Sequence, residues 1–144
     1  MTPRTHRLVL AGLALAIALM AAACEEGRTR LVMLNVDGEF RAYQLHVPAN
    51  YDPSQFAPLV IALHGAAGTG SAMEALSGFS ELADREGVIV AYPSGYAGLW
   101  NILDENQLRI PRLAGIDDIA FLEAVIEDVS GRLAVDRERI YVCG

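Results

Sequence analysis

The stretch LVIALHG at residues 59–65 decides the fold of this chain, because five apolar residues run without interruption into a His-Gly pair. A continuous apolar run of this length predicts a β-strand that is covered on both faces, as in a parallel sheet. Two further runs of this kind follow, VIVAY at residues 88–92 and RIYVCG at residues 139–144. The three runs predict three buried parallel strands, and the last one ends on Gly144.

Two segments with helical spacing separate these predicted strands. Residues 71–86 carry apolar side chains three or four positions apart and stop before Gly87, which predicts one helix. A second apolar stripe runs from Leu122 to Leu133, and Asp117 or Asp118 is expected to cap the helix that carries it. Alternation of strands and helices in this order predicts a mainly parallel α/β sheet.

A β-hairpin is expected before the parallel strands. Residues 31–36 and 40–47 read as strands on either side of Asp37-Gly38, a pair that is typical of a two-residue hairpin turn. Alternation within the second strand places His46 on the face that we expect to meet solvent. The predicted fold is therefore an N-terminal hairpin followed by parallel strands with crossover helices.

Residues 1–23 have the organisation of an export signal. Two arginines and a histidine precede a run that is nearly all apolar from Leu8 to Met20, and three alanines follow. This order predicts a secretory signal peptide rather than a transmembrane span, which needs about 20 apolar residues. Small residues directly before Cys24 resemble a bacterial lipobox and predict a lipidated cysteine that anchors the protein to a membrane. Ordinary cleavage with a free thiol is the alternative. Residues 24–30 are interpreted as a tether.

The composition excludes several classes of partner. The 144 residues include 18 Asp and Glu against 11 Lys and Arg, a formal net charge of −7. Nucleic-acid-binding proteins need clustered basic side chains, so no nucleic-acid partner is expected. Two cysteines are too few for a disulfide framework, and the spacing of His and Cys indicates no metal site. Cys143, inside its apolar run, is expected to be a buried core residue.

The loop HGAAGTGS at residues 64–71 allows more than one interpretation. A phosphate-binding P-loop is disfavoured, because Ser71 stands where the lysine that reaches the phosphates is required. A dinucleotide-binding fingerprint is disfavoured, because the third glycine is missing. An oxyanion-hole loop, in which glycines leave backbone N–H groups uncovered, remains open beside a plain glycine turn.

The wider sequence sets this loop within a series of short motifs. They are LHG at 63–65, SGF at 77–79, LADREG at 82–87, VAYPSG at 90–95, WN at 100–101, DDIAFL at 117–122 and VDRERIYVCG at 135–144. In order and spacing this series resembles the polyhydroxybutyrate depolymerase and feruloyl esterase family, whose members are exported serine esterases with the α/β-hydrolase fold. The resemblance covers about residues 40–144. It implies the N-terminal half of that fold, with residues 31–144 as a partial catalytic domain truncated at the nucleophile elbow.

By this resemblance, Gly144 is the first glycine of the G-x-S-x-G turn that carries the reactive serine. The nucleophile is then expected just after Gly144, and the triad carboxylate and histidine follow it, so the chain as given holds none of the three. The backbone N–H of Ala66 is the expected first oxyanion donor, with His64 and Gly65 shaping the loop. His64 is not the expected base, which comes last in the order of the fold.

The resemblance also implies a role for Asp117 and Asp118. Both precede the nucleophile, whereas the triad acid follows it in this fold. Their expected role is to cap and support the helix that begins beside them.

The function implied by the resemblance is hydrolysis of carboxylic esters through an acyl-serine intermediate. Expected substrates are polyester chains of short hydroxyalkanoates, or feruloyl and acetyl groups linked to plant polysaccharide. Serine ester hydrolysis requires no cofactor. Two alternatives stay open: a non-catalytic exported lipoprotein that keeps the hydrolase scaffold for binding, and an inactive gene fragment.

Overall fold

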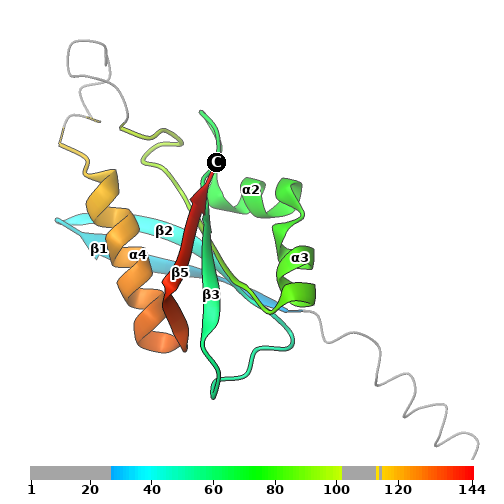
Figure 1. The fold of residues 1–144 in the computed structure, drawn as a ribbon. Coiled ribbons are helices and arrows are strands. Elements are labelled where there is room, and N and C mark those ends of the chain that lie inside the picture. The colour runs from blue at the N-terminus through cyan, green and yellow to red at the C-terminus, as the bar shows by residue number, and fades with distance from the viewer. Residues whose placement is uncertain (1–26, 102–112, 114) are drawn as a thin grey trace, which may run out of the picture.

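A computed structural model describes residues 27–101, 113 and 115–144. The predicted signal peptide and Cys24 lie outside the described residues. A five-stranded sheet has the order β1-β2-β4-β3-β5 (Figure 1). Strands β1 and β2 pair in antiparallel fashion, as do β2 and β4, while β3 pairs in parallel with both β4 and β5. This confirms the predicted hairpin followed by parallel strands. The strands are β1 (Arg28–Val36), β2 (Glu39–Val47), β3 (Ala57–Ala62), β4 (Ile89–Pro93) and β5 (Val135–Cys143).

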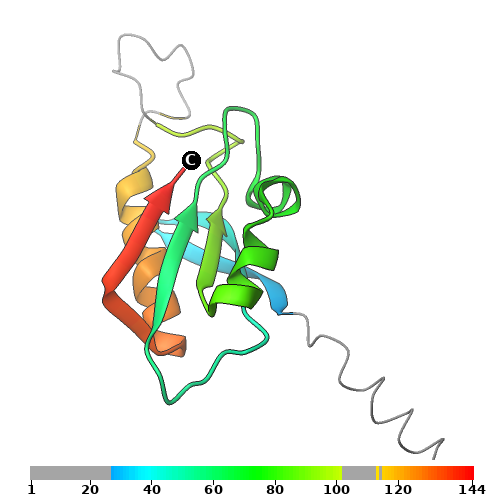
Figure 2. The same cartoon turned by 45° about the vertical axis from the view of Figure 1, so that its right-hand side comes forward.

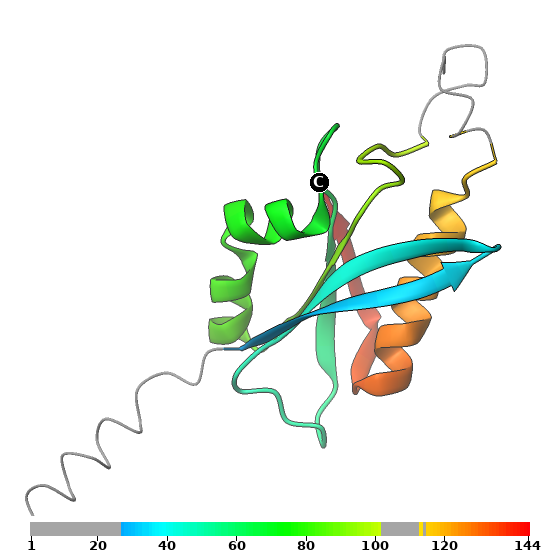
Figure 3. The same cartoon turned by 180° about the vertical axis from the view of Figure 1, so that it is seen from behind.

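The β1–β2 hairpin turns at the predicted Asp37-Gly38 pair. Both residues have positive φ values, 53° and 89°, which is the conformation that a tight two-residue hairpin turn requires. Figure 3 shows the hairpin from behind, extending from the end of α3 (Phe79–Glu86) past α4 (Asp118–Arg132). Strand β1 begins at Arg28, so it takes up the last three residues of the predicted tether.

The helices cover both faces of the sheet. Helices α2 (Gly70–Ser77) and α3 (Phe79–Glu86) lie on one face, and α4 lies on the other (Figure 2). The prediction of one continuous helix over residues 71–86 is wrong. Gly78 adopts a left-handed conformation with φ of 68° and ends α2, so Leu76 turns outward and is 86% exposed. Helix α4 is confirmed, with Asp117 as its N-cap.

Two apolar cores form, one on each face of the sheet. The larger core packs α4 against the hairpin and the parallel strands, and residues of β3 alternate between the two cores. Its central side chains include Tyr43, Leu59 and Phe121. The smaller core packs α3 against Val90 and Tyr92 of β4. None of the described helices is long and apolar enough to cross a membrane.

A polar cluster around His46 connects Gly27 and Thr29, at the start of the described chain, to Asp84 in α3 through hydrogen bonds. The prediction that His46 faces solvent is wrong, because α2 and α3 cover this face and leave it 3% exposed. His46 Nε2 lies 3.0 Å from Asp84 Oδ1, and Nδ1 lies 2.9 Å from the Thr29 hydroxyl. Burial raises the pKa of Asp84, but hydrogen bonds from the backbone N–H groups of Gly27 and Ala49 and from His46 hold the pKa below its ordinary value.

Strand β5 is more exposed than its apolar run predicts. Within the described sheet β3 is its only neighbour, so Tyr141 and Val142 are exposed and Cys143 is only half-buried. The predictions of a strand covered on both faces and of a buried Cys143 are therefore wrong for the described chain.

Candidate active site

The carboxyl ends of the three parallel strands meet at one edge of the sheet. Figures 1 and 2 show β3 and β5 pointing in the same direction, with the loop after β3 rising beside the end of β5. The Leu63 N–H donates a 2.7 Å hydrogen bond to the Cys143 carbonyl. In open α/β sheets, this edge is where ligands bind.

Gly144 lies directly against the end of β3. A Cβ added at this position would lie 2.9 Å from the Cβ of Leu63 and 3.1 Å from its carbonyl oxygen. Real Cβ atoms rarely tolerate such contacts, so the backbone needs glycine here. This close approach brings the chain at Gly144 beside the loop that begins at His64.

His64 is buried and joins two loops through its ring. Its Nδ1–H donates to the Gly65 carbonyl at 2.7 Å, since a carbonyl oxygen can only accept. Its Nε2 accepts the N–H of Gly95 at 2.9 Å, which defines the neutral tautomer with the proton on Nδ1. Both ring nitrogens are thus engaged by backbone groups.

Trp100 contacts His64 in two ways. The indole ring stacks on the imidazole with a centroid distance of 4.8 Å and an interplanar angle of 29°. Its Nε1–H also donates to the His64 carbonyl at 2.8 Å. Reasoning from sequence did not identify this contact, because the tryptophan is 36 positions away along the chain. The only available signal was one tryptophan in an otherwise irregular segment.

A tight turn follows His64. The Gly68 N–H donates to the Gly65 carbonyl at 3.1 Å, and Ala67 has a φ of 60°. A Cβ on Gly68 would lie 2.9 Å from the Gly65 oxygen, so this position also requires glycine. Ala66 sits at the exposed tip of the turn, and its N–H has no hydrogen-bond partner among the described residues. The turn therefore leaves the Ala66 N–H uncovered, three residues after Leu63, against which Gly144 packs.

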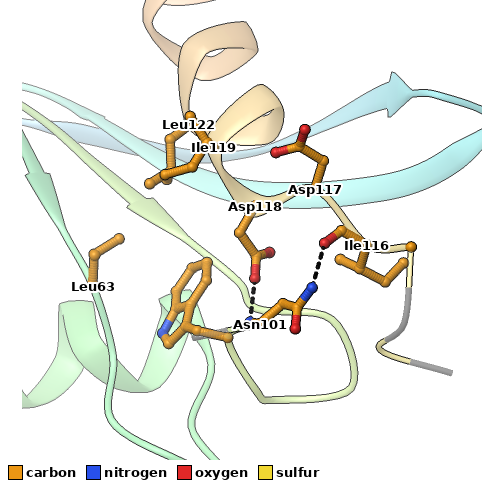
Figure 4. Close-up of a pocket in the computed structure, with 9 residues that line it drawn as sticks. Leu63, Asn101, Ile116, Asp117, Asp118, Ile119 and Leu122 are labelled. Atoms are coloured by element: carbon orange, nitrogen blue, oxygen red, sulfur yellow. Dashed lines mark hydrogen bonds between the residues drawn. The ribbon is translucent and has the colours of Figure 1, made fainter. Parts of the chain in front are cut away.

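A buried ion pair supports the neighbouring segment. Arg41 Nη2 lies 2.6 Å from Asp118 Oδ1, and the side chains are 3% and 11% exposed. The guanidinium also stacks over Phe121, 4.1 Å from the ring centroid. The second oxygen of Asp118 accepts the Asn101 N–H at 2.6 Å, while the Asn101 side chain donates to the Ile116 carbonyl at 2.9 Å (Figure 4). Asp117 caps α4, whereas Asp118 accepts the backbone N–H of Asn101, the residue after Trp100.

An open cavity of about 580 Å³ lies between α4 and the ends of the strands. Figure 4 shows Leu63 facing the first turn of α4 across this cavity, with Ile119 and Leu122 on the opposite side. The cavity wall is mainly apolar, and its polar side chains include Asn101, Asp117 and Asp118. Among the residues described, no group of three His, Cys, Asp or Glu side chains could hold a metal ion.

Comparison with known proteins relates this chain to esterases. No protein-family profile matches it. It is 36% identical over 111 residues to "Putative esterase NocK" of Nocardia uniformis subsp. tsuyamanensis, which covers 76% of this chain and 31% of that protein. It is 30% identical over 101 residues to "Feruloyl esterase B" of Piromyces equi, which covers 67% of this chain and 18% of that protein. The chain therefore spans less than a third of the length of either relative.

Solved structures support the same relation at the level of the fold. A ferulic acid esterase from Anaeromyces mucronatus superposes with a TM-score of 0.59 at 20% identity, covering 85% of this chain and 51% of that one. At this identity the likeness concerns the fold alone. The described part of the chain has the architecture of an α/β-hydrolase, and the relatives that it matches in sequence carry the names of esterases.

Proposed function

We propose that the protein hydrolyses carboxylic esters through an acyl-serine intermediate. One observation carries the proposal: the uncovered N–H of Ala66 lies on the loop after β3, and Gly144, the residue after β5, packs against Leu63 at the start of that loop. In a serine esterase of this fold, an oxyanion donor on the loop after the third strand faces the turn that holds the nucleophile. The similarity to proteins named as esterases supports the same chemistry.

The proposed mechanism assigns each group one task. The serine two positions after Gly144 attacks the ester carbonyl, and the Ala66 N–H donates to the oxygen that becomes negative. Such a donor contributes about 2.7–4 kcal/mol to the stability of the transition state. A histidine and a carboxylate beyond Gly144 take up the serine proton and orient the imidazole. His64 takes no part in proton transfer, because both of its ring nitrogens bind backbone groups.

The proposed substrates are acyl groups of natural polymers. A feruloyl ester on plant polysaccharide is favoured by similarity to a protein named feruloyl esterase B, and an acetyl ester by similarity to one named as an acetylxylan esterase. A polyester of short hydroxyalkanoates remains the second candidate from the motif series.

We further propose that the protein is exported and that a lipid on Cys24 holds it on a membrane. One acyl chain gives only marginal binding, so stable anchoring needs more than one. Replacement of Cys24 by serine is the test: a variant that stays in the membrane fraction contradicts lipidation at this residue.

The function is tested by removing the proposed donor while keeping the turn. Proline is favoured at the second position of a four-residue turn and has no N–H, so Ala66→Pro deletes the donor within a compatible backbone. Ala66→Gly retains the N–H and is the matched control. In the product of the complete reading frame, Ala66→Pro should lower kcat about 10²–10³-fold on aryl esters, while Ala66→Gly stays near wild type.

Two results would overturn the proposal. One is a reading frame without x-S-x-G after Gly144. The other is a folded Ala66→Pro protein that keeps its full kcat.

A further inference from the structure

We infer that Trp100 is a positioning residue for the proposed oxyanion loop, and that the Arg41–Asp118 pair holds Trp100 in place. The inference rests on the proposed function for its catalytic consequence, although the positioning itself can be measured without a reaction. The property that Trp100 is inferred to control is the direction in which the Ala66 N–H points.

The orientation of this N–H is decided at the Gly65 carbonyl. The Gly65 carbonyl and the Ala66 N–H belong to one planar trans peptide unit, so the two bonds point in opposite directions. Two donors engage the Gly65 oxygen: His64 Nδ1–H at 2.7 Å and the Gly68 N–H at 3.1 Å. While both bonds are made, the Ala66 N–H cannot rotate away from the direction that they set.

Trp100 fixes the histidine that makes the shorter of these bonds. Stacking of the indole on the imidazole restricts the tilt of the His64 ring. The indole Nε1–H bond to the His64 carbonyl holds the backbone at the start of the turn. The Gly95 N–H, from the segment that leads to Trp100, sets the tautomer that gives Nδ1 its proton. Ring, backbone and tautomer of His64 are therefore all determined by residues 95–100.

The segment around Trp100 is anchored in turn by α4. The next residue, Asn101, donates its N–H to Asp118 at 2.6 Å, and its side chain donates to the Ile116 carbonyl. Asp118 is itself held by the buried guanidinium of Arg41 at 2.6 Å. A continuous set of contacts thus leads from β2 through α4 to the loop after β3.

The test removes one hydrogen bond and keeps the aromatic ring. Trp100→Phe deletes the bond to the His64 carbonyl but still allows stacking. Tyr51→Phe is the matched control, because Tyr51 OH accepts the Ala134 N–H at 2.7 Å on another part of the molecule. In the complete protein, Trp100→Phe should lower kcat by roughly 10- to 100-fold with KM changed less than about twofold. Tyr51→Phe should leave kcat unchanged.

A second measurement separates this inference from the proposed function. In ¹⁵N NMR spectra, Trp100→Phe should shift the Ala66 amide signal, and Tyr51→Phe should not. If the wild-type protein hydrolyses no ester, the proposed function fails and the amide signal alone decides the positioning role. A folded Trp100→Phe protein with an unmoved Ala66 signal would overturn the inference, as would an unchanged kcat in an active enzyme.

Discussion

The buried Arg41–Asp118 pair should behave as one unit in the stability of the protein. At an effective dielectric constant of about 20, two charges 4 Å apart attract by about 4 kcal/mol, and burial of each charge opposes this gain. The Arg41 side chain is 3% exposed and its Nε has no partner in the described structure, so loss of Asp118 would leave an uncompensated buried cation. We therefore expect Asp118→Asn to lower the free energy of unfolding by about 3–5 kcal/mol.

Replacement of Arg41 should lower the free energy of unfolding by less than replacement of Asp118. Without Arg41, the Asp118 carboxylate still accepts the Asn101 N–H and sits in the first turn of α4, where the helix dipole favours a negative charge. Arg41→Met should therefore cost about 1–2 kcal/mol, and the double variant should cost little more than Arg41→Met alone. The coupling energy from the four proteins is then close to the cost of Asp118→Asn itself, about 3–5 kcal/mol.

Urea unfolding of the four proteins measures this coupling. The exposed pair Arg137–Glu127, with two bonds of 2.8 and 2.6 Å, is the matched control and should show no resolvable coupling in 0.15 M salt. A coupling energy below about 0.5 kcal/mol for Arg41 and Asp118 would refute the reasoning, because the two residues would then act independently.

Two further predictions concern Asp84 in α3 and Gly68 in the loop after β3. Because the pKa of Asp84 is lowered in the folded state, its carboxylate stabilises the protein at neutral pH, and this contribution fades as the pH falls below about 4. The stability gap between wild type and Asp84→Asn should therefore close on acidification, whereas a constant gap between pH 7 and pH 3 argues against this. Gly68→Ala places a Cβ 2.9 Å from the Gly65 oxygen and should lower stability by about 1–3 kcal/mol; an unchanged thermal melting temperature would contradict that expectation.

Much of the fold could be predicted because its signals are local. Apolar runs identified β3 and β4, the Asp37-Gly38 pair identified the hairpin turn, and the Asp117-Asp118 pair marked the start of α4. Each of these features depends on a few neighbouring residues and on physical rules that act over short distances. The prediction of one helix over residues 71–86 was wrong because it also relied on local spacing alone. Apolar spacing continues across Gly78, and only the left-handed conformation of that residue reveals two helices.

Burial was harder to predict because it depends on what covers each face. Alternation correctly separates the two faces of β2, but it does not reveal that α2 and α3 pack over His46. Likewise, the apolar run of β5 predicts a strand but not its neighbours, and the exposed Tyr141 reflects a sheet position with β3 alone beside it.

The candidate site shows why a motif can locate a loop without explaining its residues. The motif series locates the loop that begins with His64-Gly65, but it gives no physical reason why residue 64 is a histidine. The structure requires a side chain at residue 64 that donates to the Gly65 carbonyl while accepting the Gly95 N–H. Neutral imidazole does both from one rigid ring, and the same ring offers a flat face to Trp100. A residue that only donates would leave the Gly95 N–H unpaired in a buried position, which costs about 1–3 kcal/mol. A residue that only accepts would lose the shorter of the two hydrogen bonds to the Gly65 carbonyl. The histidine is thus explained by hydrogen bonding in the loop, and no proton transfer needs to be assigned to it.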